Sequence, residues 1–158
     1  MDSMVKIYIQ RALNEISIAK LLFEISNNKN KKEEFNIEEE TTFYSAVISH
    51  SYYSIFYAAK AMLLTKKIKT FAPEVHKKTY LAFKEQFVDS GILDIELLNI
   101  YKKMILRADE LLQIFKDEKW KRGHFTYQTI PQANKEPANQ SIQNAANFLK
   151  NIKTIIEK

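Results

Sequence analysis

Residues that bind phosphate and move protons gather in one segment of this 158-residue chain, "KWKRGHFTYQTIPQANKEP", which covers residues 119 to 137. It contains Lys121, Arg122, His124 and Tyr127, and also the chain's single tryptophan. Arginine can hold a phosphate through two parallel hydrogen bonds, aromatic rings stack on nucleobases, and histidine transfers protons near neutral pH. These residue types predict a site for a nucleotide or RNA. The alternative is a solvated connection whose cations lie favourably at a helix end.

A second set of candidate binding residues lies in "SHSYYSIFYAAKAMLL", residues 49 to 64. Tyr53 and Tyr57 are one helical turn apart, and His50 shares their stripe, so a helix would present all three on one side. A tyrosine hydroxyl that points into a cleft would extend the binding site. The alternative for the aromatic residues of this stretch is packing in the core or in a subunit interface.

Composition excludes several classes of site. The chain has no cysteine, and its three histidines are not spaced as metal-binding pairs. Neither a metal site nor a thiol nucleophile is therefore expected. No glycine-rich phosphate loop is present, and we expect no cofactor. The net charge of +5 permits binding to phosphate or nucleic acid without requiring it.

The sequence also lacks the marks of a membrane protein. Its N-terminal stretch has no long apolar segment of the kind found in signal peptides. No apolar run approaches the roughly 18 residues of a membrane-spanning helix. We expect a cytoplasmic protein that does not enter the membrane.

Helical periodicity dominates the chain, which has only two glycines and three prolines. Apolar residues recur at three- and four-residue steps, and no strand pattern is present. The sequence predicts a single all-α domain over residues 1–158, a five-helix antiparallel up-and-down bundle. Helices are expected at about 2–26, 41–66, 73–89, 94–120 and 137 to the end, with a charged connection at about 27–40 and a loop at about 121–136.

Particular residues mark the expected helix ends. Thr41 or Thr42 can cap the second helix through a side-chain oxygen. Pro73 suits the first position of the third helix, because its ring already has a helical φ. Gly91 is expected to stop that helix, since glycine readily adopts the left-handed conformation found at helix C-termini.

The second helix is expected at the centre of the bundle, because it is apolar around most of its circumference. Its small residues recur at three- and four-residue intervals and would let another helix approach closely. They are Ser51, Ser54, Ala58 and Ala61. We expect that one five-helix bundle does not fully cover such a helix, which predicts a homodimer.

The central helix resembles a family signature. "SHSYYSIFYAAKAMLL" is similar to the "AYYAMFYAAKALL" helix of the HEPN domain, a small helical module of prokaryotes that is also found in some eukaryotic proteins. "VHKKTYLAFKEQFVDSGIL" resembles the family's next helix with its glycine-marked turn, and "EPANQSIQNAANFLKNI" resembles its last helix. The resemblance covers about residues 44–152 and implies an HEPN-like helical bundle.

The resemblance also marks residues in the opening segment. Many members of this HEPN branch carry arginine, four intervening residues and then tyrosine before the last helix. Arg122 and Tyr127 have that spacing, although Thr126 stands where aspartate is usual. An alternative alignment gives the arginine's role to Arg107, which begins "RAD". The first alignment places Tyr127 at about the family's interval before the last helix.

Ribonuclease members of the family carry a related pattern of arginine, four to six residues and then histidine, and they cleave RNA without a metal. The resemblance implies that arginine holds the scissile phosphate while histidine moves protons. Here His124 follows Arg122 by only two positions, and Tyr127 stands where that histidine is wanted. Tyrosine ordinarily titrates near pH 10 and is a poor base at neutral pH. We therefore expect little or no ribonuclease activity.

Members of this branch are often paired with a small nucleotidyltransferase in arrangements that resemble toxin–antitoxin pairs. The resemblance implies a protein that binds a nucleotide or RNA, or that forms a complex with such an enzyme. One alternative is a metal-independent ribonuclease that uses Arg122 with His124. A second alternative is a structural dimeric module that binds no ligand.

Overall fold

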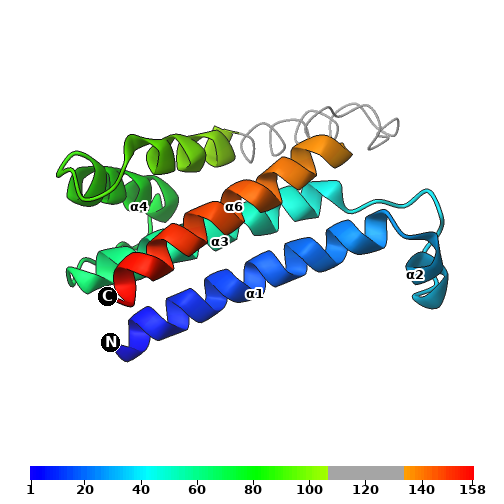
Figure 1. Ribbon diagram of the computed structural model, residues 1–158, viewed down its shortest axis with the longest axis horizontal. Helices are drawn as coiled ribbons and strands as arrows, with labels where there is room; N and C mark the ends of the chain where they lie inside the picture. The colour runs from blue at the N-terminus through cyan, green and yellow to red at the C-terminus, as the bar shows by residue number, and fades with distance from the viewer. Residues whose placement is uncertain (107–133) are drawn as a thin grey trace.

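The chain folds as an all-α bundle. A computed structural model describes residues 1–106 and 134–158, and this part of the chain contains helices and no strand (Figure 1). The predicted all-helical bundle is therefore confirmed. The elements are α1 (Ser3–Ser26), α2 (Lys29–Glu34), α3 (Tyr44–Thr65), α4 (Val75–Phe83), the π-helix η1 (Lys84–Val88), a helical segment at 95–106, and α6 (Lys135–Ile156).

Three long helices form the body of the bundle. In Figure 1, α1, α3 and α6 lie side by side, and α4 and the segment 95–106 pack at one end. α1 runs antiparallel to α3, as shown by the contacts Tyr8–Tyr57 and Glu15–His50 between them. The hydrophobic core joins all of these elements. Its members include Ala12, Ile55, Phe83, Tyr101 and Phe148.

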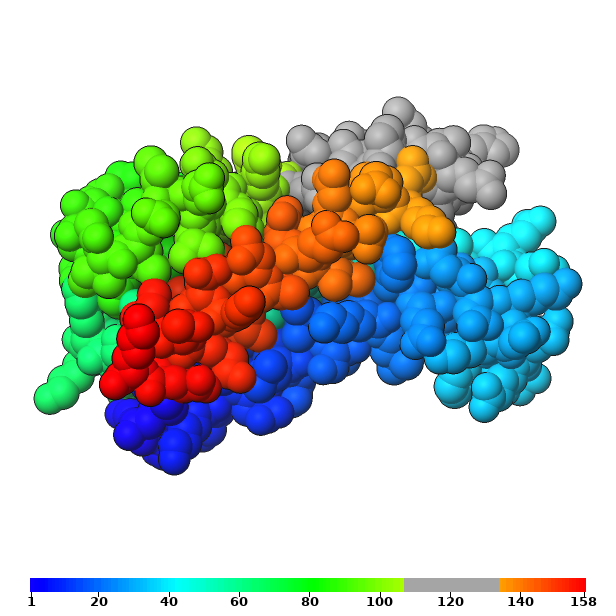
Figure 2. Space-filling view, in the orientation of Figure 1, coloured from blue at the N-terminus to red at the C-terminus, as the bar shows by residue number. Residues whose placement is uncertain are grey.

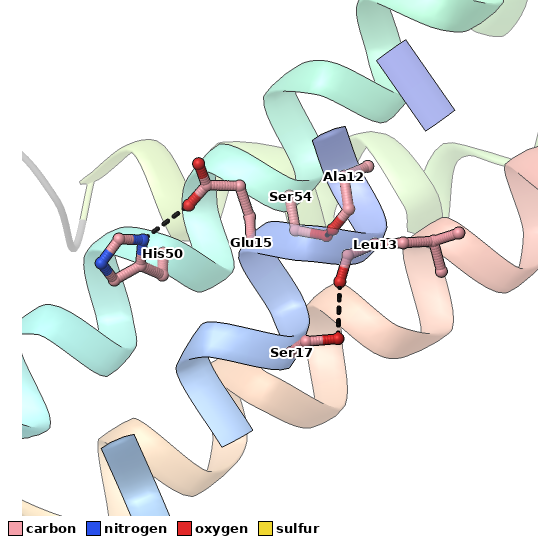
Figure 3. A network of polar contacts seen from close by, with 6 residues as sticks. All are labelled: Ala12, Leu13, Glu15, Ser17, His50 and Ser54. Carbon is pink, nitrogen blue, oxygen red and sulfur yellow. Dashed lines mark hydrogen bonds and ion pairs between the residues drawn. The ribbon is translucent and has the colours of Figure 1, made fainter. Parts of the chain in front are cut away.

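The small residues of α3 bring α1 close. Ser51, Ser54, Ala58 and Ala61 are all fully buried. The hydroxyl of Ser54 donates a hydrogen bond of 2.8 Å to the backbone oxygen of Ala12 in α1 (Figure 3). The predicted close approach of a second helix is thus confirmed, but that helix belongs to the same chain. This face is not available to another subunit, so the reason given above for a homodimer is wrong.

The charged connection expected at 27–40 is not wholly irregular. It contains α2, whose N-cap Asn28 accepts a hydrogen bond of 3.1 Å from the backbone N–H of Lys31. Lys32 in this short helix is buried and donates to the backbone oxygen of Glu39. The mixed charges of the segment hid this helix, because α2 has no apolar stripe of its own.

Two predicted helix starts are wrong. α3 begins at Tyr44 with Phe43 as its N-cap and has no side-chain cap, since phenylalanine carries no acceptor, and the Phe43 N–H donates to the hydroxyl of Ser26 at the end of α1 at 2.8 Å. α4 begins at Val75 rather than at Pro73, which follows a cis peptide bond. Tertiary contacts, which local sequence does not encode, set the start of α3.

The expected stop after the third helix is observed. That helix consists of α4 followed by η1, which ends at Val88. Gly91 then has a φ of +77°, a left-handed conformation that favours glycine, and its N–H donates to the oxygen of Val88. The helix expected at 94–120 is helical from 95 to 106, and its remainder lies outside the described residues. Among the helices that are described, none is long and apolar enough to cross a membrane.

Candidate functional site

Four of the predicted binding residues fall outside the part of the chain that the structure describes. They are Lys121, Arg122, His124 and Tyr127, and the alternative arginine, Arg107, lies there too. Their roles stay predictions. The described residues place the other two candidates, Tyr53 and Tyr57, on α3.

Tyr53 and Tyr57 belong to a row of stacked rings that crosses from α3 to α1. The rings of Tyr53 and Tyr57 are 6.3 Å apart between centroids and lie within 29° of parallel. The ring of Tyr57 continues onto Tyr8 of α1, at 6.0 Å and 23°. We call Tyr53, Tyr57 and Tyr8 the tyrosine ladder. Tyr53 is 38% exposed, so the ladder's outer rung reaches solvent.

Two cations lie over the ladder's rings. The guanidinium of Arg11 is 5.6 Å from the ring centroid of Tyr57 and 5.8 Å from that of Tyr8. The ammonium of Lys60 is 5.2 Å from the Tyr8 ring. All three distances are within the range of cation–π attraction. The surface therefore alternates flat apolar rings with positive charge, the combination that binds bases and phosphates of single-stranded nucleic acids.

His76 of α4 extends the aromatic surface. Its ring stacks on Phe56 with centroids 4.2 Å apart, and its Nδ1 shares a hydrogen bond of 2.7 Å with the hydroxyl of Tyr52. It also meets the edge of Tyr53 at 5.9 Å. α4 is thereby held against the tyrosine-rich side of α3, and His76 adds a polar ring beside the ladder.

A histidine–carboxylate pair lies between α1 and α3 (Figure 3). Nδ1 of His50 is 2.6 Å from Oε2 of Glu15, and the two side chains are 33% and 22% exposed. A carboxylate at this position fixes the orientation and tautomer of the imidazole, which is how acid–base histidines are commonly held. His50, Tyr53 and Tyr57 are three and four residues apart in α3, so His50 lies on the same side of the helix as the two tyrosines.

The ladder ends at a hollow. Tyr8 and Lys60 line a cavity of about 170 Å³ together with Lys69 and Phe71, and Phe71 is 67% exposed. The remaining lining comes from the apolar residues Met4, Leu63, Leu64 and Ile68 and from Thr70. Pockets that enclose a whole small ligand are larger, about 300–1,000 Å³. This hollow can therefore take one ring next to two ammonium groups.

Sequence reasoning missed Tyr8, Arg11, Lys60 and His76. Lys60 could have been included from the sequence, because it belongs to the same helical stretch as the predicted tyrosines. Tyr8 and Arg11 are three residues apart on α1, but nothing in the sequence gives the register in which α1 meets α3. Within the described residues, no group of three or more His, Asp or Glu side chains is placed to hold a metal ion.

These features define a small all-α bundle built around one aromatic-rich central helix. Residues 19–155 match the family described as "HEPN domain", and the chain belongs to that family. The resemblance stated from the sequence is confirmed.

Two relatives come from Methanocaldococcus jannaschii. The protein named "Putative toxin MJ0605" is 28% identical over 150 residues, which are 95% of this chain and 87% of the relative. The protein named "Putative toxin MJ0142" is 42% identical over 55 residues, and the match covers 35% of each chain. No solved structure matches the chain.

Proposed function

We propose that this HEPN-family protein is toxin-like, that it binds a nucleotide or single-stranded RNA on the tyrosine ladder, and that its partner is a small nucleotidyltransferase. The main support for the binding part of this proposal is the ladder itself. Its three rings, Tyr53, Tyr57 and Tyr8, are stacked, and the cations of Arg11 and Lys60 lie over them. The names of the two relatives support the toxin-like part.

The ladder suits a ligand made of bases and phosphates. Each base that stacks on an aromatic side chain contributes about 1–3 kcal/mol, whatever its identity. The outer rung, Tyr53, offers an accessible ring, and the hollow beyond Tyr8 offers room for one further ring. Lys60 and Lys69 line that hollow, so a phosphate attached to the ring would meet positive charge. The net charge of +5 favours the approach of a polyanion.

The predicted segment completes the proposed site. Arg122 and Tyr127 have the spacing of the family's marked positions, and Lys121 and His124 lie between or beside them in sequence. In this proposal Arg122 holds a phosphate while Tyr127 stacks on a base or donates to a phosphate oxygen. Arginine at such a position forms charge-assisted hydrogen bonds, which are stronger than neutral ones.

RNA affinity in two matched variants tests the ladder. Tyr53→Ala removes the outer rung and is expected to weaken binding of a labelled single-stranded RNA by about 5–150-fold, the equivalent of about 1–3 kcal/mol. Phe35→Ala removes an aromatic ring that is 58% exposed but lies outside the ladder, and it should leave the affinity unchanged. Fluorescence anisotropy with RNA and with ATP distinguishes the two ligands. Equal affinities for both variants would remove the ladder from the site.

The proposed partner is tested by co-expression. The chain expressed alone should arrest growth, and a small nucleotidyltransferase encoded beside it should relieve the arrest and purify with it. Growth that is unaffected by the chain would contradict the toxin-like part of the proposal. It would leave RNA binding to be judged by the affinity measurement.

The Glu15–His50 pair favours a second candidate, a metal-independent ribonuclease. In that reaction a base takes the proton of a ribose 2′-hydroxyl, the 2′-oxygen bonds to phosphorus, and the 5′-oxygen leaves with a proton. The products are a 2′,3′-cyclic phosphate and a 5′-hydroxyl. His50, held by Glu15 at 2.6 Å, has the arrangement of a general base.

Cleavage of single-stranded RNA in the presence of a chelator tests this candidate. Loss of cleavage in His50→Ala but not in His124→Ala would assign the reaction to the Glu15–His50 pair. The reverse result would assign it to Arg122 with His124, as the first sequence alternative requires. If the chain neither cleaves nor binds RNA, the structural interaction module without ligand is the remaining alternative.

A further inference from the structure

The net positive charge of the chain is concentrated where α3 turns into α4. Residues 60–78, "KAMLLTKKIKTFAPEVHKK", contain six lysines and one acidic residue, a net charge of +5 with histidine neutral. The whole chain has the same net charge, so the rest of the sequence is neutral overall. We call residues 60–78 the lysine turn. Figures 1 and 2 show it at the end of the molecule opposite α2, so an approaching anion is drawn to that end.

Three lysines of this turn gather at the hollow beside Tyr8. Lys60 and Lys69 line the hollow, together with Thr70 and Phe71. Nζ of Lys60 is 3.3 Å from the backbone oxygen of Thr70, and Nζ of Lys78 is 3.4 Å from the backbone oxygen of Phe71. The cations of Lys60 and Lys78 therefore lie beside the same stretch of wall that carries Lys69.

Within the described chain these three cations have no carboxylate partner. No ion pair between described residues involves Lys60, Lys69 or Lys78. Glu74, the acidic residue of the turn, is 3.9 Å from Lys77 instead. An ammonium has three N–H donors, and Lys60 and Lys78 each use one of them on a backbone oxygen. Because like charges repel, this grouping favours an anion that binds among the three lysines.

A hollow for one ring beside a group of cations fits a nucleotide that carries a terminal phosphate. Such a phosphate has about two negative charges at pH 7, one more than the phosphate inside a strand. We propose that the hollow and the lysine turn bind the 5′-phosphorylated first nucleotide of a single-stranded RNA. Its base occupies the hollow, and its 5′-phosphate lies among Lys60, Lys69 and Lys78. A 3′ end presents hydroxyl groups, which do not need several cations. The inference rests on the proposed function and adds the end and the direction of the strand.

The ladder favours an RNA end over a free nucleotide. Tyr8 belongs to both features, because it lines the hollow and stacks on Tyr57. Nucleotides that follow the first one therefore continue from Tyr8 toward Tyr57 and Tyr53. Arg11, whose guanidinium is 5.6 Å from the Tyr57 ring centroid, lies along this path and can hold a following phosphate. A free nucleotide would leave the outer rungs and Arg11 unused. The strand thus runs with its 5′ end at the lysine turn.

Three RNAs of one sequence test the choice of end, by competition against one labelled RNA in fluorescence anisotropy. The first has a 5′-phosphate, the second has hydroxyls at both ends, and the third has a 3′-phosphate and a 5′-hydroxyl. The 5′-phosphorylated RNA should bind about tenfold more tightly than the second, as expected for hydrogen bonds to a charged group. The third RNA carries the same added charge at the other end, and it should bind like the second.

Two matched variants test the position of the phosphate. Lys69→Gln removes a cation that lines the hollow and should abolish the preference for the 5′-phosphate. Lys67→Gln removes the same charge from the same turn, but Lys67 does not line the hollow, so this variant should keep the preference. Both lysines are exposed, so the helical circular dichroism spectrum and Tm should not change in either variant.

Two further ligands test the place of the base and the need for the strand. A 5′-phosphorylated RNA whose first nucleotide lacks its base should bind about 5–150-fold more weakly, because one stacked base is lost. AMP has the base and the phosphate but cannot reach the ladder's outer rungs. It should compete only at concentrations far above those of the RNA.

The outcomes separate this inference from the proposed function. Equal affinities for the three RNAs overturn the inference and leave RNA binding on the ladder in place, whereas no binding of any RNA overturns both. Equal loss of the preference in Lys69→Gln and Lys67→Gln would show attraction by the general charge of the turn, and would overturn the phosphate position. AMP that competes as well as the RNA would make the hollow a site for a free nucleotide and overturn the RNA end as its ligand.

Discussion

Tyr101→Phe should make the protein more stable. The Tyr101 side chain is fully buried, and its hydroxyl has no hydrogen-bond partner within the described part of the chain. Its ring packs edge-on against Tyr80 at 5.3 Å and Phe148 at 5.8 Å, so the ring itself is well held. The substitution keeps these ring contacts and removes only the unpaired oxygen.

The expected gain follows from that oxygen. A buried polar group left without a partner costs about 1–3 kcal/mol of desolvation. Removing the oxygen leaves a void of one atom, which offsets part of the gain. We therefore expect the free energy of unfolding to rise by about 1 kcal/mol, equivalent to about 2–4 °C in Tm for a chain of this size.

The same substitution should flatten the loss of stability at alkaline pH. Desolvation by burial raises the pKa of Tyr101 well above its usual value, and the nearby hydroxyls of Tyr52 and Tyr80 raise it further. In the unfolded chain this phenol loses its proton near pH 10, while the folded protein retains it. The contribution is present below about pH 10 and is lost as the pH rises toward the folded pKa, because the unfolded state then binds fewer protons. Phenylalanine has no proton to lose.

Urea unfolding at pH 7 and at about pH 10.5 measures both effects. Tyr44→Phe is the matched control, because the Tyr44 hydroxyl donates at 2.6 Å to Asn27 and its removal should cost about 0.5–1.5 kcal/mol. If Tyr101→Phe is destabilised as much as this control, the hydroxyl has a partner and the reasoning is refuted.

Three further variants test the packing and the predicted site. Ser54→Ala removes the hydrogen bond to Ala12 and should lower the free energy of unfolding by about 1 kcal/mol in urea titrations. Ala58→Leu should cost about 1–3 kcal/mol in the same assay, because the fully buried position has no room for a larger side chain beside α1. Arg122→Ala should weaken RNA binding by about 1–3 kcal/mol in anisotropy titrations, as expected for one hydrogen bond to a charged group. Its Tm should change little, and a lower Tm with unchanged affinity would make the segment structural.

The sequence was sufficient to predict the helical class and the central helix, because both depend on periodicity within one element. α3 is buried around most of its circumference, as its composition predicts. The helix starts were less predictable, because they depend on distant residues. Thr41 and Thr42 are good capping residues, yet the N–H of Phe43 is bound by Ser26 of another helix.

The candidate site shows the same limit. Tyr53 and Tyr57 were identified because their spacing places them on one side of a single helix. Tyr8 and Arg11 were not, because their place in the ladder depends on the register between α1 and α3. That register is fixed by contacts such as Ser54 with Ala12 and His50 with Glu15, which no local pattern encodes.

α1 therefore contributes to the candidate site through its packing against α3. The side of α1 that covers the small residues of α3 also brings Tyr8 against Tyr57, which completes the ladder. The same packing holds the guanidinium of Arg11 over the rings of both tyrosines, so the cation of the site depends on the register between the two helices.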